Sequence, residues 1–217
     1  MENKNNITLQ GKLKILSIDP GLCCTGWSIL EASIVVKYEQ GVNPVGFQKS
    51  SLMTSSIKVI ALGYVKTKSH SPLIERLSLI SEELRKVFYS NPCFDIVIVE
   101  NTIMGGRNFK AQQLLAHARG AILLTLKNLP SFGLLEIHAN TVKATLCKLG
   151  NAKKDDAIKK ALELVNYQGK VKNQDALDSI AIAVAAFFRY QNSFHRVLWF
   201  KAWSSLNQSF SEVLGNG

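Results

Sequence analysis

The sequence lacks the residue patterns that build zinc sites, disulfide frameworks and membrane spans. Its four cysteines contain no C-x-x-C pair, and its four histidines stand at none of the usual zinc-ligand spacings. Cys23 and Cys24 are adjacent, which makes a poor disulfide framework and favours reduced thiols. The longest apolar run, residues 180–188, is far shorter than the roughly 20 residues that cross a bilayer.

Several sequence motifs of other function classes are missing as well. The polar start has no apolar stretch typical of a secretory signal. There is no GxxxxGK[ST] loop for nucleotide phosphates, and the serine and cysteine residues have no nearby histidine that would orient them as nucleophiles. We therefore expect a soluble cytoplasmic protein with no membrane partner and with neither nucleotide-binding nor acyl-transfer chemistry.

Acidic residues are scarce relative to basic ones. The chain has 16 Asp and Glu against 26 Lys and Arg, which gives a formal charge of +10. Such an excess favours a polyanionic partner, because Lys and Arg release counterions from a phosphate backbone. The alternative is a soluble protein that is merely basic. Hydrophobic residues make up 47% of the chain, which is ample for a buried core and excludes a disordered protein.

Hydrophobic periodicity predicts five strands and five helices. The run FDIVIVE is β-branched and almost wholly apolar, as in a strand that is buried on both faces. The predicted strands cover 14–19, 25–30, 57–65, 94–100 and 134–137. The predicted helices cover 73–87, 110–127, 141–149, 153–166 and 174–190.

This order predicts an α/β fold with a five-stranded mixed sheet flanked by helices. We expect residues 1–12 to form a flexible tail and residues 13–191 to form the main domain. Within the domain, residues 38–56 mix Gly, Pro, Ser and Asn and indicate an extended loop. Residues 192–217 are a basic, aromatic C-terminal extension, which is compatible with one amphipathic helix.

Four acidic residues stand where α/β sheets place their ligands. Asp19 ends the first predicted strand, and Glu100 ends the buried central strand, so both face an edge of the sheet. Asp175 and Asp178 are three positions apart in a predicted helix and share one face among apolar neighbours. Because burying such acids without partners is costly, they need a cation or a dense hydrogen-bond network.

Taken singly, these acids also have structural explanations. Asp19 can cap a turn, Glu100 can pair with a basic residue, and Asp175 can be favoured by the helix dipole. Asp178 weakens the last explanation, because like charges on one helix face repel. Together, oxygen ligands without His or Cys suit Mg²⁺ or Mn²⁺. Two such ions can activate water and stabilise the leaving oxygen of a phosphodiester.

Lysines are concentrated in the segment that precedes the acidic helix. Between positions 143 and 172 there are eight of them: Lys143, Lys148, Lys153, Lys154, Lys159, Lys160, Lys170 and Lys172. A solvated helical face accounts for about half, and the rest are candidates for contacts to a DNA backbone. Arg107 and Lys110 flank a glycine-rich turn after Glu100 and could also reach phosphate.

These motifs resemble, in order, those of RuvC, the bacterial Holliday-junction resolvase family. ILSIDPGLCCTGWSIL is similar to its opening strand, turn and strand, and DIVIVENTIM to its second acidic motif. QLLAHARGAIL resembles its central helix, TVKATLCKLGNAKKDDAIKKAL its lysine-bearing segment, and DALDSIAIAV its last acidic helix. The resemblance extends from about residue 13 to residue 191.

The resemblance implies an RNase H-like fold and a metal-dependent endonuclease that makes paired nicks across a four-way junction. It implies that Asp19, Glu100, Asp175 and Asp178 bind two Mg²⁺ ions, with Mn²⁺ able to substitute. It places Lys143 and Lys154 at basic positions that contact DNA. It also implies a homodimer, whose two-fold axis matches the symmetry of the junction, and a branch-migration motor as a further partner.

The sequence departs from the family pattern at two places. The family usually carries an aromatic residue three positions after its second acid, where it stacks on a base; here that position is Ile103, and Phe109 is a loose substitute. The interval between Asp19 and Glu100 is also longer than usual, which we assign to residues 38–56. The alternatives are a broader flap, fork or packaging nuclease, an RNase H-type ribonuclease, and a non-catalytic junction-binding protein; the presence of all four acids argues against the last.

Overall fold

The computed structural model describes residues 6–39, 50–101, 109–127, 133–194, 196–198 and 201. Its strands are β1 (Asn6–Asp19), β2 (Cys24–Glu39), β3 (Ser50–Lys66), β4 (Ile96–Asn101) and β5 (Leu134–His138). Its helices are α1 (Leu73–Ser90), α2 (Phe109–Leu126), α3 (Ala139–Cys147), α4 (Lys154–Leu164) and α5 (Gln174–Arg189). Within these ranges no helix is both long and apolar enough to cross a bilayer.

The five strands form one mixed sheet in the order β3-β2-β1-β4-β5. β2 pairs antiparallel with both β1 and β3, whereas β4 lies parallel to β1 and β5 lies parallel to β4. The predicted five-stranded mixed sheet is therefore confirmed. Because β1, β4 and β5 run in the same direction, their carboxyl ends meet at one edge of the sheet, where open α/β sheets bind ligands.

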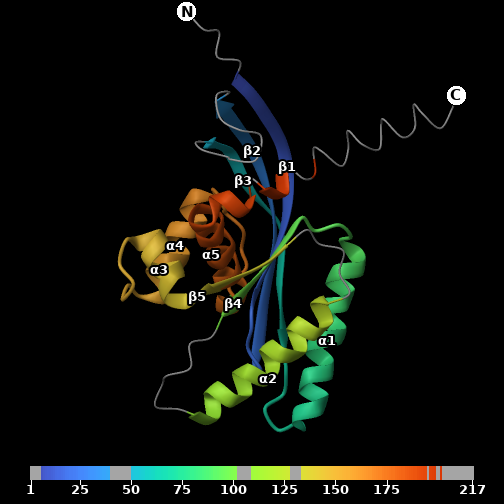
Figure 1. Cartoon of the computed structure of the whole chain (residues 1–217). Helices are drawn as coiled ribbons and strands as arrows, with labels where there is room; N and C mark the ends of the chain where they lie inside the picture. Colours follow the sequence, from blue (N-terminus) through green and yellow to red (C-terminus); the bar gives the residue numbers. More distant parts are fainter. Residues whose placement is uncertain are drawn as a thin grey trace, which may run out of the picture.

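Helices cover both faces of this sheet (Figure 1). α1 and α2 pack on one face, and α3, α4 and α5 pack on the other. Successive residues of β1 belong to the two opposite cores, with Ile15 facing α5 and Leu16 facing α1 and α2. This two-residue alternation explains why Ile15, Leu16 and Ile18 of β1 are all apolar and all buried. α5 is buried along most of its length, in keeping with its run of alanine, isoleucine and valine.

Two segments expected to be irregular are strands. Residues 6–12, expected to be a flexible tail, form the first half of β1 and pair with residues 33–39 of β2. Residues 38–39 and 50–56, expected to belong to an extended loop, continue β2 and β3, whereas residues 40–49 lie outside the described ranges. Both expectations were wrong for the same reason: backbone pairing with a neighbouring strand holds these largely polar segments in the sheet.

The described part of the C-terminal extension is packed on the domain. Phe194 and Leu198 are fully or almost fully buried and join the core that contains α5. Beyond them, the Lys201 ammonium lies 2.9 Å from the carboxylate of Asp95, which is itself buried just before β4. The second partner of Asp95 is the backbone N–H of Lys14 in β1, which donates to it at 2.7 Å. The extension thus clamps β1 and β4 at the end of the sheet opposite the acids.

This clamp predicts a loss of stability in the variant Lys201→Met. The substitution would remove the ammonium that pairs with the buried Asp95 carboxylate, and we expect it to lower the free energy of unfolding by about 2 kcal/mol. Urea denaturation measures the change. The matched control is Lys86→Met, which removes a lysine from a solvent-exposed ion pair with Glu83 and should shift the midpoint little. Equal midpoints for the two variants would contradict the clamp.

Candidate metal centre

The fold brings together the four acids predicted from the sequence. Asp19 is the last residue of β1, and Glu100 is the penultimate residue of β4. Ile18 pairs with Val99 in the sheet, so the next positions on the two strands are Asp19 and Glu100. Asp175 and Asp178 lie in the first turns of α5. One carboxylate oxygen from each of Asp19, Asp175 and Asp178 lies within 4.8 Å of the others.

A close approach of backbones positions the aspartates of α5. A Cβ atom at Gly26 of β2 would lie 1.9 Å from the carbonyl oxygen of Asp175, so any larger residue would push the helix away. Asn173 caps the start of α5, and its side-chain oxygen accepts a hydrogen bond from the Ala176 N–H at 2.9 Å. These two features fix the N-terminus of α5 against β2 and carry Asp175 and Asp178 to the sheet edge.

A tight turn follows Asp19 and joins β1 to β2. The Thr25 hydroxyl donates to the Gly21 carbonyl oxygen at 2.8 Å and closes the turn. A Cβ atom at Gly21 would lie 2.1 Å from the carbonyl oxygen of Cys24, so the turn requires glycine there. Asp19 is therefore held by a strand on one side and a hydrogen-bonded turn on the other, with only 7% of its surface exposed.

The carboxylates destabilise one another in their charged forms. Burial raises the pKa of Asp19 well above its usual value, and the neighbouring Glu100 raises it further. Burial also raises the pKa of Glu100, although contacts with Asp19 and Lys154 oppose the shift. For Asp178, burial raises the pKa to about 6 despite an ion pair with Lys154. A divalent cation would remove this penalty, and a donor set of carboxylate oxygens fits Mg²⁺ or Mn²⁺.

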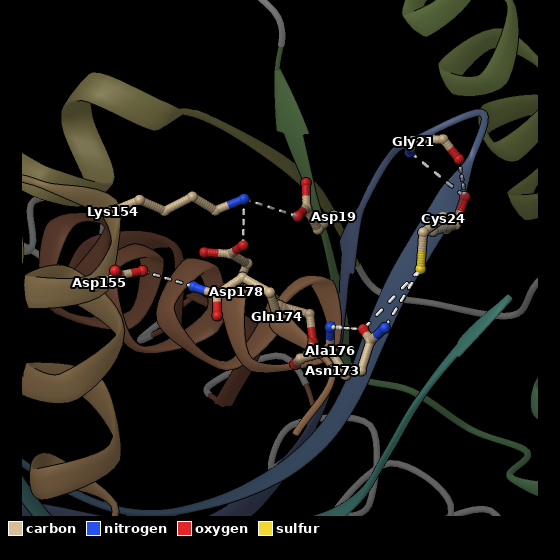
Figure 2. A network of polar contacts seen from close by, with 11 residues as sticks. Asp19, Gly21, Cys24, Lys154, Asp155, Asn173, Gln174, Ala176 and Asp178 are labelled. Carbon is tan, nitrogen blue, oxygen red and sulfur yellow. Dashed lines mark hydrogen bonds and ion pairs between the residues drawn. The ribbon is translucent and has the colours of Figure 1, made fainter. Parts of the chain in front are cut away.

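Lys154 lies inside the acid cluster rather than at its rim. Its ammonium forms an ion pair with Asp178 Oδ2 and lies 3.8 Å from Asp19 Oδ2, as Figure 2 shows. Burial disfavours the charged ammonium, but the contacts with Asp178 and Asp19 outweigh this effect and raise the pKa of Lys154. Among the described residues, it is the cation that contacts both acids. The sequence resemblance places it among the DNA contacts and does not reveal this position.

The structure describes some of the other residues predicted to contact DNA. Lys143 is half-buried on α3, and Lys110 is exposed in the first turn of α2. Phe109, considered as a substitute for the stacking aromatic, is 74% exposed at the start of α2. Ile103 and Arg107 lie outside the described residues. Among the described residues, Lys154 is the lysine that forms ion pairs with these acids, and the roles of Lys143 and Lys110 in DNA binding remain predictions.

Cys24 and His138 are neighbours of the acids that sequence reasoning missed. The Cys24 thiol lies beside Asn173 and Asp175, and burial together with a hydrogen bond to Asp175 raises the pKa of this thiol to about 11. His138 ends β5, opposite Asn101, and its charge lowers the pKa of Glu100. Their positions in the sequence could have indicated that they lie near the acids, because Cys24 is the first residue of the strand after the Asp19 turn and His138 is the last residue of the third parallel strand.

Comparison with known proteins identifies the family from the sequence, and comparison with solved structures identifies the fold. The family model described as crossover junction endodeoxyribonuclease RuvC matches residues 35–186, which include Glu100, Asp175 and Asp178 but begin after Asp19. The crossover junction endodeoxyribonuclease RuvC of Rickettsia conorii is 28% identical over 169 residues, which cover 78% of this chain and 93% of the relative. That of Endomicrobium trichonymphae is 32% identical over 173 residues, which cover 78% of each chain.

The solved structure of Thermus thermophilus RuvC superimposes with a TM-score of 0.61 at 20% identity, covering 83% of this chain and 97% of that one. The same protein solved in complex with a Holliday junction substrate gives a TM-score of 0.61 at 18% identity, covering 82% and 96%. At these identities the structures establish the RNase H-like fold, while the family model and the sequence relatives establish the family. The chain belongs to the RuvC family of crossover junction endodeoxyribonucleases.

Proposed function

We propose that this protein is a metal-dependent endonuclease that resolves four-way DNA junctions by paired nicks. The observation that carries the proposal is the meeting of Asp19, Asp175 and Asp178 within 4.8 Å, beside Glu100, in a chain of the RuvC family. The formal charge of +10 supports a polyanionic substrate. We place the protein in the cytoplasm with the DNA and propose a branch-migration motor as a further partner.

The four carboxylates are the residues that would hold the ions. We propose two Mg²⁺ per site, with Mn²⁺ as a substitute, because hard oxygen donors without histidine or thiolate suit these cations. The chemistry that bound divalent ions supply is activation of a water and stabilisation of the leaving oxygen of a phosphodiester. The sheet edge orients the carboxylates: Asp19 and Glu100 stand at adjacent positions of parallel strands, and Asp178 on α5 faces Asp19 (Figure 2).

The basic residues of the chain would bind the substrate backbone around this centre. Lys154 is already at the acids, and Lys143 and Lys110 lie on the neighbouring helices α3 and α2. Arg107 and Ile103 belong to the segment between β4 and α2, and we keep both as predicted DNA contacts. Membership of the RuvC family leads us to expect ligatable ends, with a 3′-hydroxyl and a 5′-phosphate, which form when water attacks the phosphorus and the 3′ oxygen is the leaving group.

The substrate is tested by cleavage of synthetic junctions, forks, flaps, duplexes and RNA–DNA hybrids in Mg²⁺. We expect symmetric nicks in four-way junctions, and loss of cleavage by on the order of a hundredfold or more in Asp19→Asn and Glu100→Gln. Both variants should still bind junctions in Ca²⁺, as gel shift would show. Full activity in either variant would contradict the metal centre. Preferential cleavage of hybrids or flaps would instead select an RNase H-type or a broader branched-DNA nuclease.

Metal affinity should depend on pH in the range set by the buried aspartates. With a pKa of about 6, Asp178 holds a proton below that pH in the metal-free protein, and the proton must leave before a cation binds. We therefore expect the affinity for Mn²⁺ to rise between about pH 5 and pH 7, by up to about tenfold per pH unit for each displaced proton. Isothermal titration calorimetry measures it. A constant affinity across this range would contradict the raised pKa.

We further propose that the protein acts as a homodimer through an exposed face of α2. Phe109 and Leu124 are 74% and 70% exposed at opposite ends of this helix. Between them Ala116 and Gly120 are exposed one turn apart, and a Cβ atom at Gly120 would meet nothing within 4 Å. A second copy packed on this face would cover apolar surface and bring two metal centres to two strands of a two-fold symmetric junction.

The variant Gly120→Glu tests this interface. A charge placed in the middle of the apolar face should convert the dimer to a monomer, while the helix itself is favoured because glutamate has the higher helix propensity. Light scattering during gel filtration measures the mass. The matched control is Ser90→Glu, which adds the same charge at the exposed end of α1 and should leave the dimer intact. A dimer that persists in Gly120→Glu would move the interface elsewhere.

A further inference from the structure

The position of Lys154 has a consequence for metal binding. Its ammonium contacts Oδ2 of Asp178 and lies 3.8 Å from Oδ2 of Asp19. Both carboxylates are buried, at 5% and 7% exposure, and both belong to the cluster that fits a divalent ion. Figure 2 shows the lysine side chain reaching from α4 across to these two acids. The ammonium therefore lies where its charge offsets part of the negative charge of these two carboxylates.

A divalent ion and this ammonium would compete for the same two carboxylates, because Asp19 and Asp178 both contact the lysine and both belong to the cluster that would hold the ion. Mg²⁺ prefers carboxylate oxygens as its protein ligands. Two cations at such short range repel strongly at the reduced dielectric of a half-buried site. The ammonium, in its observed position, and a divalent ion at these carboxylates are therefore unfavourable together, and one of the two cations must leave.

The local structure allows the lysine head group to move while its backbone stays in place. Lys154 is the first residue of α4, and its side chain remains 58% exposed although its tip touches buried acids. The next residue, Asp155, accepts a hydrogen bond from the Gln174 side chain at 2.9 Å. That bond ties the start of α4 to the start of α5, so the flexible four-carbon stem of Lys154 is the part that is free to swing.

We propose that Lys154 is a substitute cation that holds Asp19 and Asp178 in place until metal binds, and that metal binding then releases its ammonium to the DNA backbone. The inference rests on the proposed function, since it assigns a step of regulation to that metal centre. This exchange couples the two binding events through Lys154: metal binding favours DNA binding, and DNA binding favours metal binding. The lysine stabilises the acids without metal and gains a phosphate contact once a divalent ion has replaced it.

The first test follows the Lys154 amine without DNA and without activity. Limited acylation of the full chain, read by mass spectrometry, should show that Lys154 reacts slowly in EDTA and several-fold faster as Mn²⁺ is added. The midpoint should equal the dissociation constant for Mn²⁺ measured by calorimetry. Lys153 is the internal control, because it is the adjacent, exposed lysine and forms no ion pair with a carboxylate among the described residues. Its labelling should not respond to the metal.

The second test uses Lys154→Met with Lys153→Met as its matched charge-loss control. We expect Lys154→Met to bind Mn²⁺ about tenfold more tightly than the wild type, because the competing cation is gone, and Lys153→Met to differ by less than about twofold. In junction binding, the salt slopes of the wild type and Lys154→Met should agree in EDTA. In Ca²⁺ the slope of Lys154→Met should be shallower by about one phosphate contact, or 0.9 units.

The outcomes separate this inference from the proposed function. Mn²⁺ binding with unchanged Lys154 labelling, or equal Mn²⁺ affinities in the wild type and Lys154→Met, would overturn the exchange while leaving the metal centre intact. A loss of slope in EDTA as large as in Ca²⁺ would also overturn it, since the lysine would then bind DNA without being released. Absence of any Mn²⁺ binding by the wild type would instead refute the metal centre itself.

Discussion

Repulsion among buried carboxylates is the constraint on which the rest of this structure depends. Asp19, Glu100, Asp175 and Asp178 converge on one edge of the sheet, and burial with mutual repulsion raises the pKa values of three of them. Such a cluster opposes folding unless a cation is supplied, because an uncompensated buried charge is costly. The Lys154 ammonium supplies part of that compensation through its ion pair with Asp178.

The fold is arranged so that this cluster forms despite its electrostatic cost. Parallel pairing of β1 and β4 sets Asp19 beside Glu100, and glycine at position 26 lets the start of α5 approach β2 closely enough to add the two aspartates. Two apolar cores on opposite faces of the sheet stabilise these elements. At the far end, Lys201 and Asp95 clamp β1 and β4 together. The apolar cores and the clamp therefore stabilise the sheet along its length, and the electrostatic repulsion is confined to one edge.

The sequence predicted what depends on local pattern and missed what depends on distant pairing. Asp19 and Glu100 could be identified because each ends an apolar strand, and parallel strand ends meet at one edge. The strand at residues 6–12 was missed because its polar residues match those of a loop until the partner strand is known. Likewise, Lys154 sits in a lysine-rich segment that equally describes a solvated helix face, and only the packing of α4 against α5 reveals its contact with Asp178. Ile103 and Arg107 remain predictions.

Anomalous diffraction from crystals grown with Mn²⁺ is the measurement that tests the central claim most directly. The account predicts anomalous density among the carboxylates of Asp19, Asp175 and Asp178, with Glu100 alongside, and the Lys154 ammonium moved away from Asp178. Crystals soaked in chelator should show the ammonium back between Asp19 and Asp178. No anomalous density among these acids at millimolar Mn²⁺, with Lys154 still paired to Asp178, would contradict the account.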